Sequence, residues 1–143
     1  MRISTKGIYA LEVTVDLACY ASEEKRATIR DIAKRRGISE KYLERIVGLL
    51  KKGGIVSSAR GALGGYCLAR KDSEITVLQV LEAAEGDLAP VDCLVRAADC
   101  KMDCDTCPTR KHWNHMWELL KNAVKDTTIE AIVKSVVDKE KTL

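Results

Sequence analysis

The pattern of apolar and polar positions predicts three helices in the first third of the chain. Apolar residues at helical spacing predict an amphipathic helix over about residues 4–21. A short second helix follows Thr28-Ile-Arg-Asp31, a capping box in which Asp31 replaces the usual Glu, and it ends at Gly37. The third helix runs from its N-cap Ser39 to about Lys52 and buries one apolar stripe, which consists of Leu43, Ile46, Val47 and Leu50. Two helices joined by a tight turn that contains glycine are typical of a helix-turn-helix, although any small helical hairpin with a solvated face fits the same periodicity.

Two short runs after the third helix predict a β-hairpin. They cover about residues 55–59 and 66–69, and the tip between them, Arg60-Gly-Ala-Leu-Gly-Gly65, is rich in glycine. A hairpin directly after a helix-turn-helix is a wing, whose glycines allow the backbone to approach DNA phosphates or the minor groove. A nucleotide-binding loop also uses glycines, but here no P-loop lysine follows and no helix begins directly after the tip. The hairpin therefore favours a winged helix-turn-helix.

The second half of the chain predicts further helices and one large aromatic face. A fourth helix spans about residues 75–85 and ends at Gly86. Beyond Pro108 a long helix carries both tryptophans of a chain that has no phenylalanine, on a stripe of Trp113, Met116, Trp117, Leu120 and Val124. So large an apolar face outside the small N-terminal core predicts a homodimer interface, with packing against the chain's own first helix as the alternative. Thr127 or Thr128 caps a short last helix, whose lysine-rich end is expected to fray.

These elements define the expected fold class, which is mainly α-helical with a small β-hairpin wing. We expect a winged helix-turn-helix domain over residues 1–85, a cysteine-rich loop over 86–108, and a long dimerisation helix with a C-terminal tail over 109–143. A chain of 143 residues suffices for one compact domain with such an extension. No run approaches the roughly 20 apolar residues that span a bilayer, and Glu12 and Asp16 interrupt any signal-peptide core. The sequence therefore predicts a cytoplasmic protein without membrane contact, in a compartment where thiols stay reduced.

The net charge of +3 conceals an asymmetry between the two halves of the chain. Residues 1–71 hold 15 Lys and Arg against 7 Asp and Glu, whereas residues 72–143 hold 9 against 14, so the halves carry +8 and −5. A basic half predicts binding to a polyanion, with a chance distribution of surface charge as the alternative.

The third helix and the wing supply the expected contacts to double-stranded DNA. In a helix-turn-helix the second helix enters the major groove, where Lys41, Glu44 and Arg45 can reach base edges. In the wing, Arg60 together with Gly61 suits a narrow, negative minor groove. Phosphate contacts, which give affinity and salt dependence but no sequence information, are expected from Lys6, Arg30, Lys34, Lys51 and Lys52.

Four of the six cysteines fall within one short segment, at Cys93, Cys100, Cys104 and Cys107. The segment is otherwise acidic and has few apolar side chains, so it cannot bury enough of itself to offset the entropy of becoming ordered. Four thiolates that converge on a metal can order it, because metal binding and local folding then share one free energy. Soft thiolates select zinc or iron–sulfur centres over hard cations. The loop therefore predicts a metal or cluster sensor, whereas Cys19 and Cys67 are interpreted as packing residues.

Several stretches together resemble one family of winged-helix regulators, typified by the iron–sulfur assembly regulator IscR, the nitric-oxide sensor NsrR and the cysteine-metabolism regulator CymR. The stretches are the opening Met-Arg-Ile-Ser-Thr-Lys-Gly-Ile-Tyr-Ala, the segment Ile38-Ser-Glu-Lys-Tyr-Leu-Glu44, the wing Ser58-Ala-Arg-Gly-Ala-Leu-Gly-Gly-Tyr66 and Cys107-Pro-Thr-Arg-Lys-His-Trp113. The resemblance covers essentially the whole chain. It implies a homodimer that binds a palindromic operator and controls genes of cluster assembly, iron, stress or sulfur metabolism.

The resemblance also implies ligands for an iron–sulfur cluster. Cluster-binding members carry three cysteines in this loop, which by position are Cys93, Cys100 and Cys107. Cys104 is additional to that pattern. An all-cysteine site accepts either a two-iron or a four-iron cluster, and family analogy favours the two-iron form.

The fourth ligand of the family varies. It is a histidine three residues after the last cysteine, or an acidic residue near the N-terminus that the partner subunit donates. These positions hold Arg110 and Ile8 here, and neither side chain can ligate a metal. Cys104 is the obvious replacement, with His112 and His115 as weaker candidates.

The leading hypothesis is a DNA-binding transcription regulator, a repressor and not an enzyme, that senses iron–sulfur or redox status through the loop at residues 93–107. Two alternatives keep DNA binding: a structural zinc site in the same loop, or a switch in which Cys104 and Cys107 form a disulfide. A small redox protein is a remote alternative from another class. It would need a substrate pocket and a second redox group, and the sequence has neither a nucleotide fingerprint nor an acid–base constellation.

Overall fold

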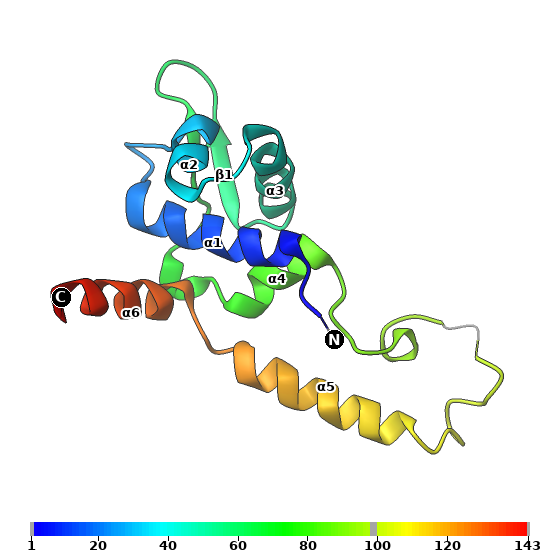
Figure 1. The fold of residues 1–143 in the computed structure, drawn as a ribbon. Coiled ribbons are helices and arrows are strands. Elements are labelled where there is room, and N and C mark those ends of the chain that lie inside the picture. Colours follow the sequence, from blue (N-terminus) through cyan, green and yellow to red (C-terminus); the bar gives the residue numbers. More distant parts are fainter. Residues whose placement is uncertain (1, 98–99, 143) are drawn as a thin grey trace.

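The computed structural model describes residues 2–97 and 100–142. Within this part of the chain, helices form most of the main body, the tip of a two-stranded hairpin projects from it, and a long helix extends away from it (Figure 1). The mainly helical architecture with a small hairpin confirms the predicted fold class. The elements in chain order are α1 (Thr5–Tyr20), α2 (Ile29–Arg36), α3 (Glu40–Lys52), β1 (Val56–Ala59), β2 (Gly65–Leu68), α4 (Val77–Glu85), α5 (Arg110–Val124) and α6 (Ile129–Thr142), with short 3-10 turns at Asp72–Glu74 and Asp92–Leu94.

Local sequence signals set the ends of α2 and α3 as predicted. The Thr28 side chain accepts a hydrogen bond from the Asp31 backbone N–H, and the Asp31 carboxylate accepts one from the Thr28 N–H, so the capping box is complete. Gly37 ends α2 with φ of 68°, a left-handed conformation that a glycine adopts without strain. Ser39 then caps α3 by accepting a hydrogen bond from the Tyr42 N–H. These caps fix the tight turn of the helix-turn-helix.

Helix α1 lies at the centre of the hydrophobic core and contacts α2, α3, α4, α6 and the hairpin. Its residues Ala10, Val13 and Leu17 are completely buried. The predicted stripe of α3 faces the same core, with each member at most 1% exposed: Leu43, Ile46, Val47 and Leu50. Burying one such aliphatic side chain contributes roughly 1.5–3 kcal/mol, so this core fixes the position of α3.

One carboxylate is buried among these apolar residues. Asp16 on α1 is 0% exposed and accepts hydrogen bonds from the guanidinium groups of Arg35, at 2.8 Å, and Arg36, at 2.9 Å. Arg35 also lies over the Tyr20 ring, with 4.8 Å between the guanidinium carbon and the ring centroid. A buried charge requires such partners, and here they fasten α1 to the end of α2.

Helix α6 returns to the N-terminal core. Ile129 is completely buried in it, and its backbone N–H donates to the Ile75 carbonyl at 2.9 Å. The Val77 N–H likewise donates to the Thr127 carbonyl at 2.8 Å. The last helix is longer than the short one that we predicted, since it spans 14 residues, and only its first part is buried. The C-terminal segment therefore completes the core that α1 organises.

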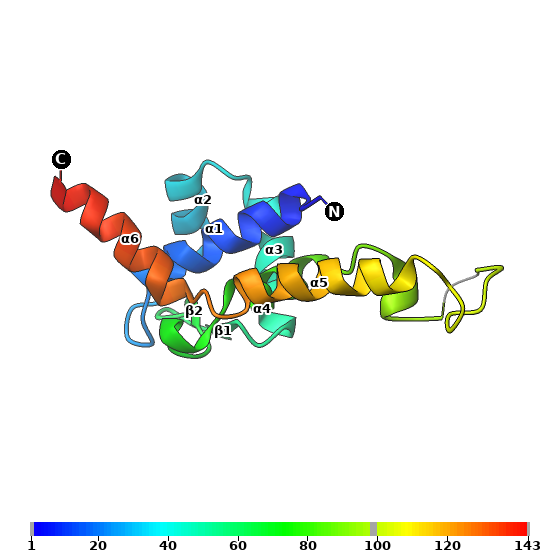
Figure 2. The same ribbon diagram turned by 90° about the horizontal axis from the view of Figure 1, so that it is seen from below.

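Helix α5 and the cysteine loop form an arm beside this body, as both Figure 1 and Figure 2 show. The helix contacts the rest of the chain mainly at α4. Among the described residues, no helix is long and apolar enough to cross a membrane.

Candidate functional site

The N-terminal half of α3 presents a polar, basic surface on the side opposite its buried stripe. The predicted base-contacting residues Lys41, Glu44 and Arg45 are all exposed. A surface hollow of about 390 Å³ is lined by Ser39, Lys41, Tyr42 and Arg45. The structure thus brings Lys41 and Arg45 together around one depression at the start of α3.

The wing follows as a regular antiparallel hairpin. Its register pairs Val56 with Leu68 and Ala59 with Gly65, and the neighbouring backbone of Ala27 also bonds to Tyr66. The tip requires glycine, because a Cβ at Gly64 would lie 2.6 Å from the Ala59 carbonyl oxygen. Tight backbone geometry therefore fixes the shape of the tip.

A second hollow, of about 440 Å³, lies between the wing, the start of α2 and the end of α3. Arg60, Gly61 and Lys51 line it together with Thr28. Lys51, a predicted phosphate contact, thus lines the same hollow as the predicted wing residues Arg60 and Gly61. Cationic side chains and open backbone around a concave surface suit a nucleic-acid phosphate.

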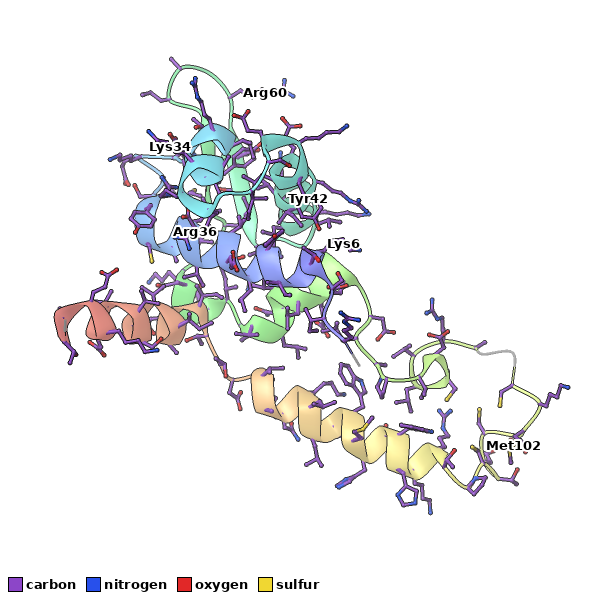
Figure 3. The ribbon with its side chains drawn as sticks, viewed as in Figure 1. Lys6, Lys34, Arg36, Tyr42, Arg60 and Met102 are labelled. Atoms are coloured by element: carbon purple, nitrogen blue, oxygen red, sulfur yellow. The ribbon has the colours of Figure 1, made fainter. Side chains whose placement is uncertain are left out.

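The other predicted phosphate contacts are distributed around these hollows. Arg30, Lys34 and Lys52 are exposed, whereas Lys6 is half-buried. In Figure 3, Arg60 lies at the wing, Lys34 lies on α2, and Lys6 lies at the start of α1, below α3. The predicted set therefore extends from the wing to the start of the chain.

Sequence reasoning missed Tyr42 and Ser39 as surface candidates. Tyr42 is half-buried, packs edge-to-face on Tyr9 with 5.7 Å between ring centroids, and lines the hollow beside Lys41 and Arg45 (Figure 3). Its position directly before Leu43, at the border of the apolar stripe, was the available signal. Such a border residue can pack with one side of its ring and present its hydroxyl group to a ligand.

The four predicted thiol ligands lie along the extended loop before α5. Cys93 and Cys107, at its two ends, are half-buried, whereas Cys100 and Cys104 are exposed. Among residues 2–97 and 100–142, no three His, Cys, Asp or Glu side chains converge closely enough to hold a metal ion. The weaker candidates His112 and His115 are exposed on α5. The structure thus places the cysteines on one loop without gathering their sulfur atoms.

The chemistry of this donor set fits a thiolate-bound metal or cluster. All six cysteines are free thiols, and the four in the loop are accessible to solvent to some degree. Met102 within the loop is 51% exposed, so the segment has little apolar burial of its own to order it. Four accessible thiols on one loop are the type of donor set that zinc and iron–sulfur centres prefer.

The sulfur of Cys107 lies beside hydrogen-bond donors at the start of α5. It lies 3.5 Å from the Thr109 hydroxyl. That hydroxyl group, followed by the backbone N–H groups of Thr109 and Arg110, lowers the pKa of Cys107 below its ordinary value of 9.0. A lower pKa increases the thiolate fraction, and the thiolate is both the metal ligand and the nucleophile.

The end of α4 is bonded to the start of α1. The Glu85 carboxylate accepts hydrogen bonds from the Ser4 N–H at 2.8 Å and the Gly7 N–H at 3.0 Å, and also from the Ser4 hydroxyl. Partial burial raises the pKa of Glu85, but these hydrogen bonds outweigh it and the net pKa lies below the ordinary 4.5. Glu85 directly precedes Gly86 and the cysteine loop, so its hydrogen bonds link the start of that loop to helix α1.

The predicted interface stripe on α5 is partly uncovered. Trp117 is buried against the chain's own residues, whereas Trp113 is 39% and Leu120 37% exposed. Met116 and Val124 are half-buried. Helix α5 does not lie along α1, which was the alternative partner for this face (Figure 1).

The arrangement of α2, α3 and the wing defines a winged helix-turn-helix transcription regulator. A family model described as "Rrf2: Iron-dependent Transcriptional regulator" matches residues 3–135. The chain belongs to the Rrf2 family of transcriptional regulators, which confirms the resemblance seen in the sequence.

Individual relatives agree with this assignment. The chain is 34% identical to protein rrf2 of Nitratidesulfovibrio vulgaris over 94% of its own length and 88% of that protein. It is also 34% identical to the HTH-type transcriptional regulator IscR of Photorhabdus laumondii, over 94% of its length and 80% of that protein. The solved structure of CymR, the global cysteine regulator of B. subtilis, matches with a TM-score of 0.74 and 30% identity, covering 94% of this chain and 98% of that one. IscR and CymR are regulators of transcription, and this chain is likewise a regulator and not an enzyme.

Proposed function

We propose that the chain is a homodimeric repressor that binds a palindromic DNA operator and senses iron–sulfur or redox status through its cysteine loop. The observation that carries this proposal is the position of the loop. Four accessible thiols lie between α4, whose last residue Glu85 is bonded to α1, and α5, whose apolar face is partly uncovered. A change at the thiols can therefore reach both the DNA-binding domain and the proposed dimer helix.

The DNA-binding part of the proposal rests on the two hollows beside α3. Lys41, Glu44 and Arg45 would contact base edges in the major groove, and Arg60 with Gly61 would contact the adjacent minor groove. The surrounding lysines and arginines would supply phosphate contacts, and these make affinity depend on salt.

For the sensing part, Cys93, Cys100 and Cys107 would hold an iron–sulfur cluster, with Cys104 as fourth ligand in preference to His112 or His115. Four cysteine donors suit a two-iron or a four-iron cluster, and family analogy favours the two-iron form. When bound, such a cluster supplies sensitivity to oxidants and to iron supply. The chain's own contribution would be a change in the relative position of the two wings of the proposed dimer when the thiols bind the cluster.

The connection at Glu85 supports this coupling. If ordering the loop moves the end of α4, the hydrogen bonds to Ser4 and Gly7 transmit the shift to α1, near the proposed phosphate contact Lys6. Cluster binding at the loop and DNA binding at α3 and the wing would then shift the same equilibrium between two arrangements of the chain. Allosteric coupling requires such a shared equilibrium.

The test is to purify the chain without oxygen, record its visible spectrum, and assay iron, acid-labile sulfide and zinc in the same sample. We expect brown protein that contains iron and sulfide, and a colourless Cys100→Ala variant. DNA duplexes selected from random sequence, separately by loaded and metal-free protein, then serve as probes in gel retardation. Equal affinity and equal sequence preference of the two forms would contradict the sensing mechanism.

A thiol switch is the second candidate function. Cys104 and Cys107 are separated by two residues, and the environment of Thr109 favours the thiolate of Cys107. A peroxide could take two electrons and two protons from this pair to leave a disulfide and water. Metal-free protein whose DNA binding responds to peroxide, and whose Cys104→Ser variant does not respond, would favour this switch.

A structural zinc site in the same loop would give a different outcome in the metal assay. Colourless protein with one zinc per chain, whose DNA binding ignores oxidants, would leave the regulator assignment intact. The loop would then stabilise the fold and would not sense anything.

A further inference from the structure

We propose that Arg110 is a positioning residue for the thiol site, holding the two ends of the cysteine loop together before any metal binds. This inference rests on the proposed function, because it assumes that the loop thiols bind a metal or cluster. Arg110 is the first residue of α5, three positions after Cys107. Its guanidinium Nη1 donates a hydrogen bond to the backbone carbonyl of Cys93 at 2.9 Å.

This hydrogen bond connects residues that are 17 positions apart and closes the loop at its base. Cys93 lies in the 3-10 turn Asp92–Leu94, and Cys107 lies directly before α5. These are the two half-buried thiols of the loop, whereas Cys100 and Cys104 between them are exposed. The bond therefore ties the turn that carries Cys93, the first proposed ligand, to the start of α5, three residues after Cys107, the last one.

The side chain suits this role for chemical reasons. Arginine stays protonated, so it cannot bind the metal and compete with the thiolates. Its planar group carries five N–H donors, so it can hold the Cys93 carbonyl and still face the negative charge that four thiolates bring. The bond is partly buried, where a charged donor to a carbonyl is stronger than at an open surface.

The expected gain is pre-organisation of the metal site. Bringing the two ends of a loop together costs conformational entropy. A hydrogen bond that already joins the ends reduces the entropy that is lost when the metal binds. Groups that orient metal ligands without touching the metal typically change metal affinity by about 10- to 100-fold when they are mutated. We expect Arg110→Ala to weaken metal binding within that range.

The experiment compares reduced, metal-free wild type with Arg110→Ala, Arg110→Lys and Lys111→Ala. Lys111 is exposed and one residue further along α5, so its variant removes the same charge and serves as the matched control. Zinc(II) is titrated anaerobically against a chromophoric chelator to obtain its dissociation constant for each protein. Thermal unfolding of the metal-free proteins checks that each variant is folded.

Hydrogen exchange of the metal-free proteins provides a readout that does not involve metal. The Val95 and Arg96 amides donate to the Asp92 carbonyl, each at 3.0 Å, and report whether the turn around Cys93 is ordered. We expect faster exchange of these two amides in Arg110→Ala only, about 10- to 100-fold weaker zinc binding by the same variant, and an intermediate result for Arg110→Lys. The Lys111→Ala variant should match wild type in both measurements.

Two results would overturn the inference while the proposed function stands. One is wild-type zinc affinity and wild-type exchange in Arg110→Ala. The other is equal weakening by Arg110→Ala and Lys111→Ala, which would assign the effect to charge alone. If wild type binds neither zinc nor a cluster rebuilt from iron and sulfide, the metal-sensing function fails and the inference fails with it.

Discussion

Asp16 shows how a single buried polar residue can connect two helices of the helix-turn-helix region. It is completely buried, and its carboxylate is held by Arg35 and Arg36, whose side chains are 29% and 32% exposed. These two arginines belong to the basic half of the chain, but neither was among the residues predicted to contact DNA. The structure uses them to fasten α2 to α1, so that the helix-turn-helix is attached to the core by ionic as well as apolar contacts.

We predict that Asp16→Ala lowers the free energy of unfolding by about 3 kcal/mol, near the lower end of the range for breaking a buried ion pair. The lower end applies because both arginines can turn toward water once the carboxylate is gone. Urea unfolding followed by circular dichroism measures the difference. Glu12→Ala is the control, since Glu12 is an exposed carboxylate on the same helix and its loss should change stability by less than about 0.5 kcal/mol. Similar effects of the two variants would contradict this role for Asp16.

Base contacts and phosphate contacts predict different signatures in DNA binding. We expect Arg45→Ala to weaken the binding free energy for the selected operator by about 1–3 kcal/mol and to relax the sequence preference, because Arg45 lines the hollow at the start of α3.

Lys34→Ala should weaken binding to all sequences alike and reduce the slope of log affinity against log salt by about one. Fluorescence anisotropy at several salt concentrations measures both quantities. A variant of Arg45 that loses affinity equally for operator and random DNA would assign this residue to phosphate contact instead.

At the scale of elements, the joint between α1 and α4 has a defined pH dependence. Hydrogen bonds from Ser4 and Gly7 hold the pKa of Glu85 below its ordinary 4.5, against the raising effect of partial burial. Because the folded-state pKa is the lower one, the carboxylate contributes stability above the unfolded-state pKa. That contribution is lost as the pH falls through the folded-state pKa.

We therefore predict that Glu85→Gln lowers the free energy of unfolding by about 1 kcal/mol at pH 7, the scale of hydrogen bonds to a charged acceptor near the surface. The difference from wild type should shrink as the pH falls below 4.5. Denaturant unfolding at a series of pH values measures it. Glu82→Gln, on the same helix and exposed, provides the control. A difference between wild type and Glu85→Gln that stays constant down to acid pH would show that the charge of Glu85 is not what holds α1.

For the whole molecule, the arm formed by α5 is the surface through which we propose that two chains associate. Trp113 and Leu120 leave apolar surface uncovered, and the small domain does not fold back over them. A second copy that packs the same face against this one would bury that surface in a symmetric contact. Two DNA-binding domains would then be presented together, as a palindromic operator requires.

We predict that Trp113→Glu converts a dimer to a monomer and weakens binding to a palindromic operator by at least tenfold, while each domain remains folded. Light scattering coupled to size-exclusion chromatography measures the mass. Asn122→Glu is the matched control, because residue 122 lies on the opposite side of a 3.6-residue helix from residue 113 and is exposed. A dimer that survives the Trp113 change but not the Asn122 change would move the interface to the other face of α5.

The sequence by itself determined the elements that depend on near neighbours. The capping box of Thr28 and Asp31, the stop at Gly37 and the cap at Ser39 each act within one helical turn, so a local pattern is sufficient to predict them. The apolar stripe of α3 and the glycine tip of the wing are local in the same sense. The identity of the four thiol ligands stays a prediction, because residue type and spacing specify the chemistry of the donors but not where their sulfur atoms meet.

Only the tertiary structure decided which distant residues meet. Asp16 bonds to Arg35 and Arg36, 19 and 20 positions away, and Ser4 bonds to Glu85, 81 positions away. The backbone bond from Ile129 to Ile75 and the bond from Arg110 to the Cys93 carbonyl are of the same kind. Such contacts form because burying the shared core brings separate helices to one place. Their partners are therefore set by the packing of the whole chain, which no local pattern of residues encodes.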